Sequence, residues 1–160
     1  MPLSLIHIFS GSGIKLLFGT GERNYSEVCK DAGNVPDNVT ITPYINNMAE
    51  VMSAADLVVA RSGAITVSEL ACLAKPAVLI PSPNVVRNHQ EQNAKEFADA
   101  GAAVMLKEDA LSPESLYNTV TKLVNDKAAL AEMSERMKQF AKKDALEEFW
   151  QLLLKMTNRS

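Results

Sequence analysis

The chain has few residues of the kinds that build metal sites, disulfide frameworks or membrane spans. Its 160 residues include two cysteines and two histidines. Neither His7 nor His89 has a second ligand three or four positions away, and Cys29 and Cys72 stand far apart. This pattern favours free thiols and a reducing compartment, and it makes a metal site an unfavoured interpretation. No run approaches the roughly 18 apolar residues that a membrane span requires.

A strong charge of either sign is also missing. The net charge is −3 at pH 7, which gives no electrostatic case for nucleic-acid binding. Hydrophobic residues make up 47% and charged residues 22%, which is ordinary for a soluble globular chain. A chain of this length can build one domain with a proper core.

The amino terminus is unusual. "MPLSLIHIF" is apolar but has no basic residue before its apolar run, so it does not resemble a secretory signal. We expect residues 1–9 to form a first strand or to lie outside the fold. The predicted organisation is an atypical stretch over residues 1–13, truncated or not native, an α/β domain over 14–141, and a helical tail over 142–160.

Short apolar runs alternate with amphipathic stretches along most of the chain. The pattern predicts strands at 14–18, 38–45, 56–60, 76–81 and 102–106, and helices at 23–32, 46–55, 64–74, 88–100 and 112–126. Gly33 and Gly101 are predicted to end two of these helices, and Ser112 to cap the start of a third. From residue 127 the pattern is helical. Strands that are apolar on both faces and separated by single helices predict a doubly wound, Rossmann-like parallel sheet with helices on both faces. Ligands of such folds bind at the carboxyl ends of the strands.

The segment after the third predicted strand, "RSGAITVSE" at 61–69, could hold a phosphate and a ribose. A helix that begins near Ala64 offers free N–H groups to an anion, and Gly63 would let its oxygens approach the backbone. We also expect the backbone to turn sharply at Gly63, so that a larger residue there would harm the fold. Thr66 would add a hydroxyl, and Glu69 could accept hydrogen bonds from a ribose diol. The same Thr66 and Glu69 also fit a capping box, which needs no ligand.

Two other segments follow predicted strands. In "PSPNVVRNHQEQNA" (81–94), the amides of Gln90 and Gln92 could bind sugar hydroxyls, or Asn88 could cap a helix with polar surface behind it. In "TPYINNM" (42–48), backbone groups could bind the edge of a base between Ile45 and Met48. Core packing would explain Ile45 and Met48 equally well.

Together these segments resemble a known family. R-S-G-A-x-T-x-S-E followed by P-x-P and H-Q-x-x-N-A, with "LLFGTG" before and "AGAAVML" after, is similar to the donor-binding half of MurG-type glycosyltransferases, family 28. The resemblance covers about residues 14–156. It implies one half of a GT-B architecture, in which two Rossmann-like domains face a cleft. It also implies transfer of GlcNAc from UDP-GlcNAc to lipid I, with inversion and without a metal, in peptidoglycan synthesis.

The resemblance assigns the nucleotide to three segments. Backbone groups of Ile45 would bind uracil, Met48 would lie near the base, and Glu69 would hold the ribose hydroxyls. The diphosphate would lie over the turn and helix start formed by Ser62, Gly63, Ala64, Ile65 and Thr66.

The sugar is assigned to the segment after the fourth predicted strand. His89 and Gln90 would lie at the GlcNAc, with Gln90 favoured. Arg61 and Asn93 match the motif, but the resemblance gives neither of them a direct contact.

The chain also departs from the family. The family's domain opens with a strand, a G-G-S-x-G-A loop and a helix, whereas thirteen residues precede Ile14 here and "SGSG" (10–13) is a poor substitute. Half of the phosphate cradle and the acceptor domain, with its general base, would lie outside this chain, so no catalytic residue is predicted. We expect a donor domain that is inactive alone and reaches lipid I through that domain or a partner chain. The complete protein would be cytoplasmic, at the inner face of the membrane.

Two alternatives differ in class. The chain could be a stand-alone UDP-sugar-binding subunit with a membrane-anchored partner, because residues 145–156 form an apolar tail suited to an interface. A nucleotide-sugar epimerase ranks below both, since the sequence lacks an evident set of carboxylates and a base facing the sugar.

Overall fold

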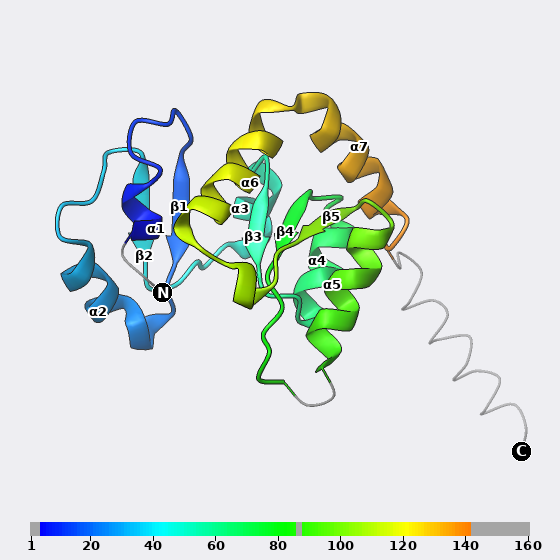
Figure 1. Cartoon of the computed structure of the whole chain (residues 1–160), viewed down its shortest axis with the longest axis horizontal. Coiled ribbons are helices and arrows are strands. Elements are labelled where there is room, and N and C mark those ends of the chain that lie inside the picture. The colour runs from blue at the N-terminus through cyan, green and yellow to red at the C-terminus, as the bar shows by residue number, and fades with distance from the viewer. Residues whose placement is uncertain (1–3, 86–87, 142–160) are drawn as a thin grey trace, which may run out of the picture.

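The computed structural model describes residues 4–85 and 88–141 of the chain. Five strands alternate with helices (Figure 1). The strands are β1 (Leu16–Gly19), β2 (Val39–Thr42), β3 (Val58–Ala60), β4 (Ala77–Leu79) and β5 (Ala103–Met105). The helices are α1 (Ser4–His7), α2 (Glu22–Ala32), α3 (Met48–Ala54), α4 (Ala64–Cys72), α5 (His89–Asp99), α6 (Pro113–Asn125) and α7 (Lys127–Lys138), with a 3₁₀ turn at Glu108–Ala110.

The strands form two parallel sheets. β1 pairs with β2 in one, with Leu16 opposite Val39. The other has the order β3-β4-β5, with Ala77 of β4 between Val58 and Ala103. The predicted parallel α/β fold is confirmed. The strands do not join into the single sheet that we expected, because β1 and β3 are not hydrogen-bonded to each other.

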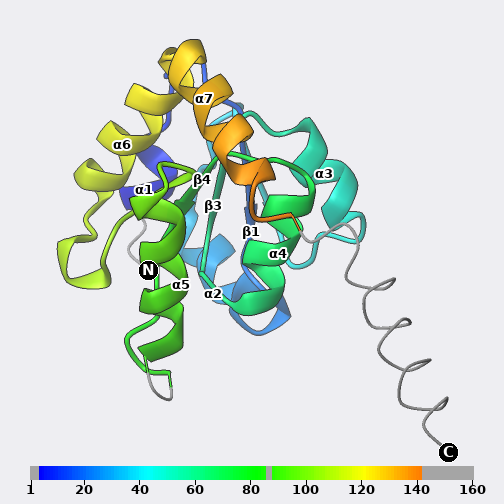
Figure 2. The same cartoon turned by 90° about the vertical axis from the view of Figure 1, so that its right-hand side faces the viewer.

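The core lies on both faces of β4. Ala77 and Leu79 pack in a cluster with residues of α4 and α5, whereas Val78 and Ile80 pack on the opposite face with residues of α6 and α7. Figure 2 shows α6 on one side of the strands and α4 on the other. This arrangement explains why the 76–81 run is apolar throughout, and it confirms the expected helices on both faces.

The amino terminus differs from the prediction. The described part of residues 1–9 contains the short helix α1 and no strand. Ile6 and Phe9 are 4% and 3% exposed, and the Phe9 ring lies 5.3 Å from the ring of Tyr117 in α6. These two apolar residues are three positions apart, which places them on one side of a helical turn and lets both reach the core. Residues 4–9 are therefore neither a strand nor outside the fold.

The helix ends follow the predicted signals in part. Gly33 and Gly101 adopt positive φ after α2 and α5, as the sequence predicted. Ser112 caps α6 in a reciprocal pair with Ser115. Asn88 occupies the N-cap position of α5, but its side chain donates to Glu91 and does not cap the helix.

Two points about the chain remain, a helix able to span a membrane and the predicted carboxyl-terminal tail. No helix in the described ranges is long and apolar enough to span a bilayer. The predicted tail at 142–160 lies outside the described residues.

Candidate functional site

The residues predicted to bind a ligand follow the carboxyl ends of β2, β3 and β4. In Figure 1 the loop between β4 and α5 lies at the opposite end of the strands from α7. The chain turns at Arg61–Gly63 into α4 and at 81–88 into α5. The parallel order thus places the starts of α4 and α5 on one edge, as the rule for such sheets requires.

The first turn of α4 presents unpaired backbone donors. Gly63 is the N-cap residue and provides no side-chain cap, and the first helical bond runs from Val67 N to Gly63 O at 3.0 Å. The N–H groups of Ala64, Ile65 and Thr66 therefore have no acceptor within the helix, and the helix dipole favours an anion in front of them.

Two alternatives raised by the sequence fail at this turn. Thr66 is the third residue of α4 and not its N-cap, so the capping-box interpretation of Thr66 and Glu69 is wrong. Gly63 has φ −64° and ψ 149°, and a Cβ placed on it would meet no atom within 4 Å. The fold of this chain therefore does not require glycine at 63, and the expectation of a sharp turn there is wrong.

Ser62 is fully buried and joins the two loops. Its Oγ donates to the carbonyl oxygen of Gln90 at 2.8 Å, and its own carbonyl accepts from Asn93 Nδ2 at 2.9 Å. Gln90 Oε1 accepts from Ser82 N at 2.9 Å. This network fixes the start of α5 against the start of α4. It gives Ser62, Gln90 and Asn93 structural contacts, while the His89 side chain is exposed.

An open hollow of about 430 Å³ lies along the outer face of α4. It is lined by Ala64, Ile65, Ser68, Glu69 and Cys72. Ile65 is 77% exposed although it is a large apolar residue. The hollow brings three predicted residues together: Ala64, Ile65 and Glu69. An apolar surface next to a carboxylate and free N–H groups suits a polar ligand with a flat or aliphatic part.

Arg61 connects the ends of three strands. Its Nη1 donates to the carbonyl oxygens of Ile80 and Pro81 at 3.3 Å and lies 2.7 Å from Glu108 Oε2. The guanidinium holds the pKa of Glu108 below its usual value, chiefly through this hydrogen bond. Glu108, which follows β5, was not among the predicted residues, although the same carboxyl-end rule points to that position.

A second ion pair ties the segment after β5 to the start of α5. Lys107 contacts Glu91, and this contact, with a further hydrogen bond from Asn88, lowers the pKa of Glu91. Neither Lys107 nor Glu91 was predicted. The two ion pairs attach the segment after β5 to the loop before α4, through Arg61, and to the start of α5, through Glu91.

Ile45 and Met48 lie after β2, on the two-stranded sheet. Ile45 is half-buried and packs over Gly19, where its Cδ1 would lie 3.2 Å from a Cβ. Met48 is 43% exposed and Tyr44 is 64% exposed, so core packing does not explain Met48. They follow the carboxyl end of β2, as the start of α4 follows the carboxyl end of β3.

Groups of three or more histidine, cysteine or acidic side chains able to hold a metal are absent from the described residues.

Comparison with known proteins gives a consistent picture. Residues 7–149 match the family described as "Glycosyltransferase family 28 C-terminal domain". A curated relative from Acetivibrio thermocellus is 43% identical over 145 residues and is named UDP-N-acetylglucosamine--N-acetylmuramyl-(pentapeptide) pyrophosphoryl-undecaprenol N-acetylglucosamine transferase. A relative of the same name from Bacillus cytotoxicus is 40% identical over 157 residues. The alignments cover 90% and 96% of this chain but 39% and 43% of those relatives, so the chain spans about two fifths of their length.

Solved structures agree with this match. The crystal structure of Acinetobacter baumannii MurG is 33% identical, with a TM-score of 0.75 over 87% of this chain and 40% of that one. The glycosyltransferase VinC, crystallised with dTDP, has a TM-score of 0.80 over 99% of this chain and 38% of its own, but at 17% identity it supports the fold alone.

Proposed function

Since the chain belongs to the glycosyltransferase family 28 C-terminal domain family, we propose that it is the donor-binding domain of an inverting GlcNAc transferase. The donor is UDP-GlcNAc and the acceptor is lipid I, the substrate pair that the names of the relatives suggest. The observation that carries the proposal is the uncapped first turn of α4 beside Glu69. The whole reaction also needs residues that bind the acceptor, and the chain spans about two fifths of the relatives' length.

In this proposal the nucleotide lies across the start of α4. The N–H groups of Ala64, Ile65 and Thr66 donate to the diphosphate, and the Thr66 hydroxyl adds another donor. Glu69, one turn further along the helix, accepts from the ribose hydroxyls. The apolar side chain of Ile65 lines the same hollow as Glu69 and would cover the sugar ring.

Base and GlcNAc would be bound by the neighbouring strand ends. Backbone groups of Ile45 bind uracil and Met48 flanks it. His89 and Gln90 lie toward the GlcNAc. The side-chain Oε1 of Gln90 accepts from Ser82 N, and its Nε2 is the group that would donate to a sugar hydroxyl.

The chemical role of this domain is to stabilise the leaving group. As the bond between GlcNAc and the diphosphate breaks, negative charge grows on UDP. Prearranged N–H groups and the dipole of α4 can stabilise that charge without a metal ion. The base that removes the proton from the acceptor hydroxyl belongs to the acceptor domain. Together the two domains would act at the inner face of the cell membrane.

Calorimetric titration of the purified chain with UDP, UDP-GlcNAc and ADP tests the proposal. We expect the uridine ligands to bind and ADP to bind more weakly. Glu69→Ala should weaken UDP binding by about 1–3 kcal/mol, the value of hydrogen bonds to a charged group. The matched control is Glu27→Ala, an exposed glutamate on α2. Equal affinity of Glu69→Ala and the parent, or no uridine binding by a folded chain, would contradict the proposal.

A further inference from the structure

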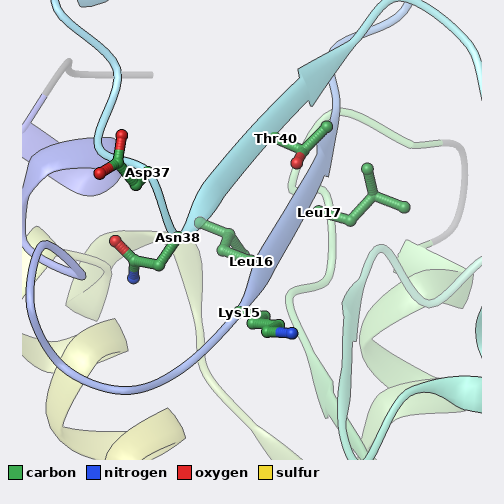
Figure 3. Close-up of a pocket in the computed structure, with 6 residues that line it drawn as sticks. All are labelled: Lys15, Leu16, Leu17, Asp37, Asn38 and Thr40. Atoms are coloured by element: carbon green, nitrogen blue, oxygen red, sulfur yellow. The ribbon is translucent and has the colours of Figure 1, made fainter.

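Helix α3 connects the two sheets of the fold. It follows β2 of the two-stranded sheet and leads into β3 of the three-stranded sheet. β1 and β3 are not hydrogen-bonded to each other, and Leu17 is 41% exposed in a hollow of about 510 Å³ along β1 and β2 (Figure 3). Strand pairing therefore does not fix the position of β2, or of the segment that follows it, relative to α4.

Few side chains of α3 reach the core. Among its seven residues only Met52 is buried. Met52 lies in the core cluster that contains Val67 and Leu70 of α4, and it is the one member of that cluster that precedes β3. The Asn47 side chain donates to Glu50 and makes no capping hydrogen bond at the helix start. Because one buried side chain holds a short helix weakly, a second contact should matter to its position.

Lys75 supplies a second contact, at the carboxyl end of α3. Its Nζ donates to the carbonyl oxygens of Ser53 and Ala55, at 2.9 Å and 2.7 Å. The last carbonyl groups of a helix have no partner within the helix and form the negative end of its dipole, so an ammonium group is favoured there. Two hydrogen bonds from one ammonium group fix the helix end in both distance and direction.

The backbone of the turn after α4 places Lys75 beside α3. Ala74 has φ 51°, in the left-handed region that favours glycine. Its N–H donates to Ala71 O at 3.0 Å and the Lys75 N–H donates to Leu70 O at 2.9 Å, which is the Schellman pattern of a helix end. The carbonyl oxygen of Ala74 accepts from Ser134 Oγ of α7 at 2.7 Å. Lys75 therefore extends from a turn that is bonded to both α4 and α7.

Lys75 lies at the opposite end of the strands from the proposed ligand. It precedes β4, whereas the residues proposed to bind the nucleotide follow the carboxyl ends of β2 and β3. The seven residues of α3 rise about 10 Å at 1.5 Å per residue, with Met48 at one end and the Lys75 contacts at the other. Because a hydrogen-bonded helix moves as a unit, the position of its carboxyl end determines that of Met48 and of Ile45 before it.

We propose that Lys75 is a positioning residue for the nucleotide. It holds α3 so that Ile45 and Met48 lie at the distance from the first turn of α4 that one nucleotide can span. The inference rests on the proposed function, in which the base binds at Ile45 and Met48 and the diphosphate binds at α4. A lysine with a structural role alone would change stability. A positioning lysine also changes the affinity for a ligand that reaches both segments, and spares a ligand that reaches only α4.

Titration of the full chain with UDP and with inorganic pyrophosphate separates these two roles. Lys75→Met keeps an aliphatic side chain but loses all three donors. We expect the UDP affinity of this variant, measured by calorimetry, to fall by about tenfold, because the two halves of the site are no longer prearranged. Pyrophosphate affinity, followed by NMR at the Ala64 and Ile65 amides, should change by less than about twofold, since pyrophosphate has no base.

Two further variants serve as controls. Lys75→Arg keeps a cation with several N–H donors and should recover UDP affinity at least in part. Lys30→Met removes an exposed lysine from α2 and should bind both ligands as the parent does. Circular dichroism checks that each variant is folded.

Amide hydrogen exchange tests the contact without a nucleotide. In Lys75→Met we expect exchange to be faster by about tenfold or more at Val51 and Ala55, whose N–H groups donate to Asn47 O and Val51 O in the first and last turns of α3. Exchange at Val67, whose N–H donates to Gly63 O in α4, should stay close to that of the parent.

Three results would overturn the inference: unchanged UDP affinity in Lys75→Met, an equal loss of UDP and pyrophosphate affinity, or unchanged exchange in α3. Failure of the proposed function gives a different result. A folded parent chain that binds no uridine ligand, or that shows no pyrophosphate shift at the α4 amides, contradicts the donor role. A parent that binds both ligands, with a Lys75→Met variant that binds UDP equally well, contradicts only the positioning role.

Discussion

At the start of α4, some residues make contacts that hold the fold, and others are exposed and are proposed to bind a ligand. Ser62 is 0% exposed and makes hydrogen bonds to α5 through both its hydroxyl and its carbonyl. Ile65 and Glu69 are exposed and line one hollow. Adjacent positions of one motif therefore differ in role, and single substitutions should separate the structural role from the proposed ligand-binding role.

Replacing Ser62 tests the structural role. Ser62→Ala removes the donor to the Gln90 carbonyl in a buried place, so we expect the free energy of unfolding to fall by about 1–2 kcal/mol. The control is Ser68→Ala, whose exposed hydroxyl only donates to Ala64 O of its own helix, and which should cost less than about 0.5 kcal/mol. Urea unfolding measures both. Equal losses of unfolding free energy in the two variants would mean that the buried hydrogen bond of Ser62 does not stabilise the fold more than the exposed one of Ser68.

Replacing Gly63 tests the proposed ligand-binding role. Its backbone is extended and nothing lies within 4 Å of an added Cβ, so Gly63→Val should keep the chain folded, with a stability loss of about 1 kcal/mol or less at the N-cap. A branched side chain in front of the free N–H groups should weaken UDP binding by about tenfold or more. Calorimetry gives the affinity and circular dichroism the fold. Normal UDP affinity in a folded Gly63→Val chain would show that the diphosphate does not bind at this turn.

At the scale of elements, helix starts are fixed in different ways in this fold. α6 begins with a complete reciprocal cap between Ser112 and Ser115, followed by Pro113 at the first helical position. α4 begins at Gly63 with no side-chain cap. Both helices pack in the core, but only the first turn of α6 is capped by its own side chains. The first turn of α4 is the one that we propose binds a diphosphate.

Removing the cap of α6 gives a prediction about stability alone. Ser112→Ala should lower the free energy of unfolding by about 0.5–2 kcal/mol and leave UDP affinity unchanged. Ser26→Ala, at an exposed position of α2, is the comparison and should change neither quantity. A loss of UDP affinity in Ser112→Ala would show that α6 is coupled to the site, against this expectation.

The segment after β5 makes its contacts through charge, which predicts a pH dependence. Arg61 lowers the folded-state pKa of Glu108, so the pair stabilises the fold above the unfolded-state pKa and this contribution disappears as pH falls through the folded-state pKa. Glu108→Gln should therefore have a lower Tm than the parent at pH 7. The difference should vanish at strongly acid pH and shrink in high salt, since both partners are about half exposed. A difference that persists unchanged in acid would assign it to packing instead.

The whole molecule is held together by residues from both ends of the described chain. Phe9 packs in the same cluster as Val78 of the central strand and Met133 of α7. The cluster also includes Leu16 of β1, so it joins the two sheets. Residues 4–13 are therefore part of what fixes the two sheets relative to each other.

Truncating Phe9 measures that contribution. Phe9→Ala should lower the free energy of unfolding by about 3–5 kcal/mol, the cost of a large buried side chain replaced by a cavity. Leu17→Ala, at an apolar side chain that is 41% exposed, should cost far less. Thermal and urea unfolding monitored by far-ultraviolet circular dichroism give both values. Equal effects would indicate that the amino-terminal segment does not pack in solution as it does in the structure.

The sequence by itself determined the order and type of most elements, because continuous apolar runs between amphipathic stretches allow little besides parallel strands and covering helices. It also predicted which edge of the strands would bind a ligand, since parallel strands end at the same side and the Arg61–Glu69 motif follows one of them. The caps at Gly33, Gly101 and Ser112 were readable for the same local reason.

Only the tertiary structure decided what depends on distant partners. The burial of Ile6 and Phe9, the network from Ser62 to Gln90 and Asn93, and the pairing of Arg61 with Glu108 join residues from separate elements, which no local pattern contains. The choice between capping box and open helix at Thr66 was settled by where α4 begins. The division into two sheets likewise followed from pairing, because hydrogen bonds between strands depend on which edges meet in space and not on the composition of either strand.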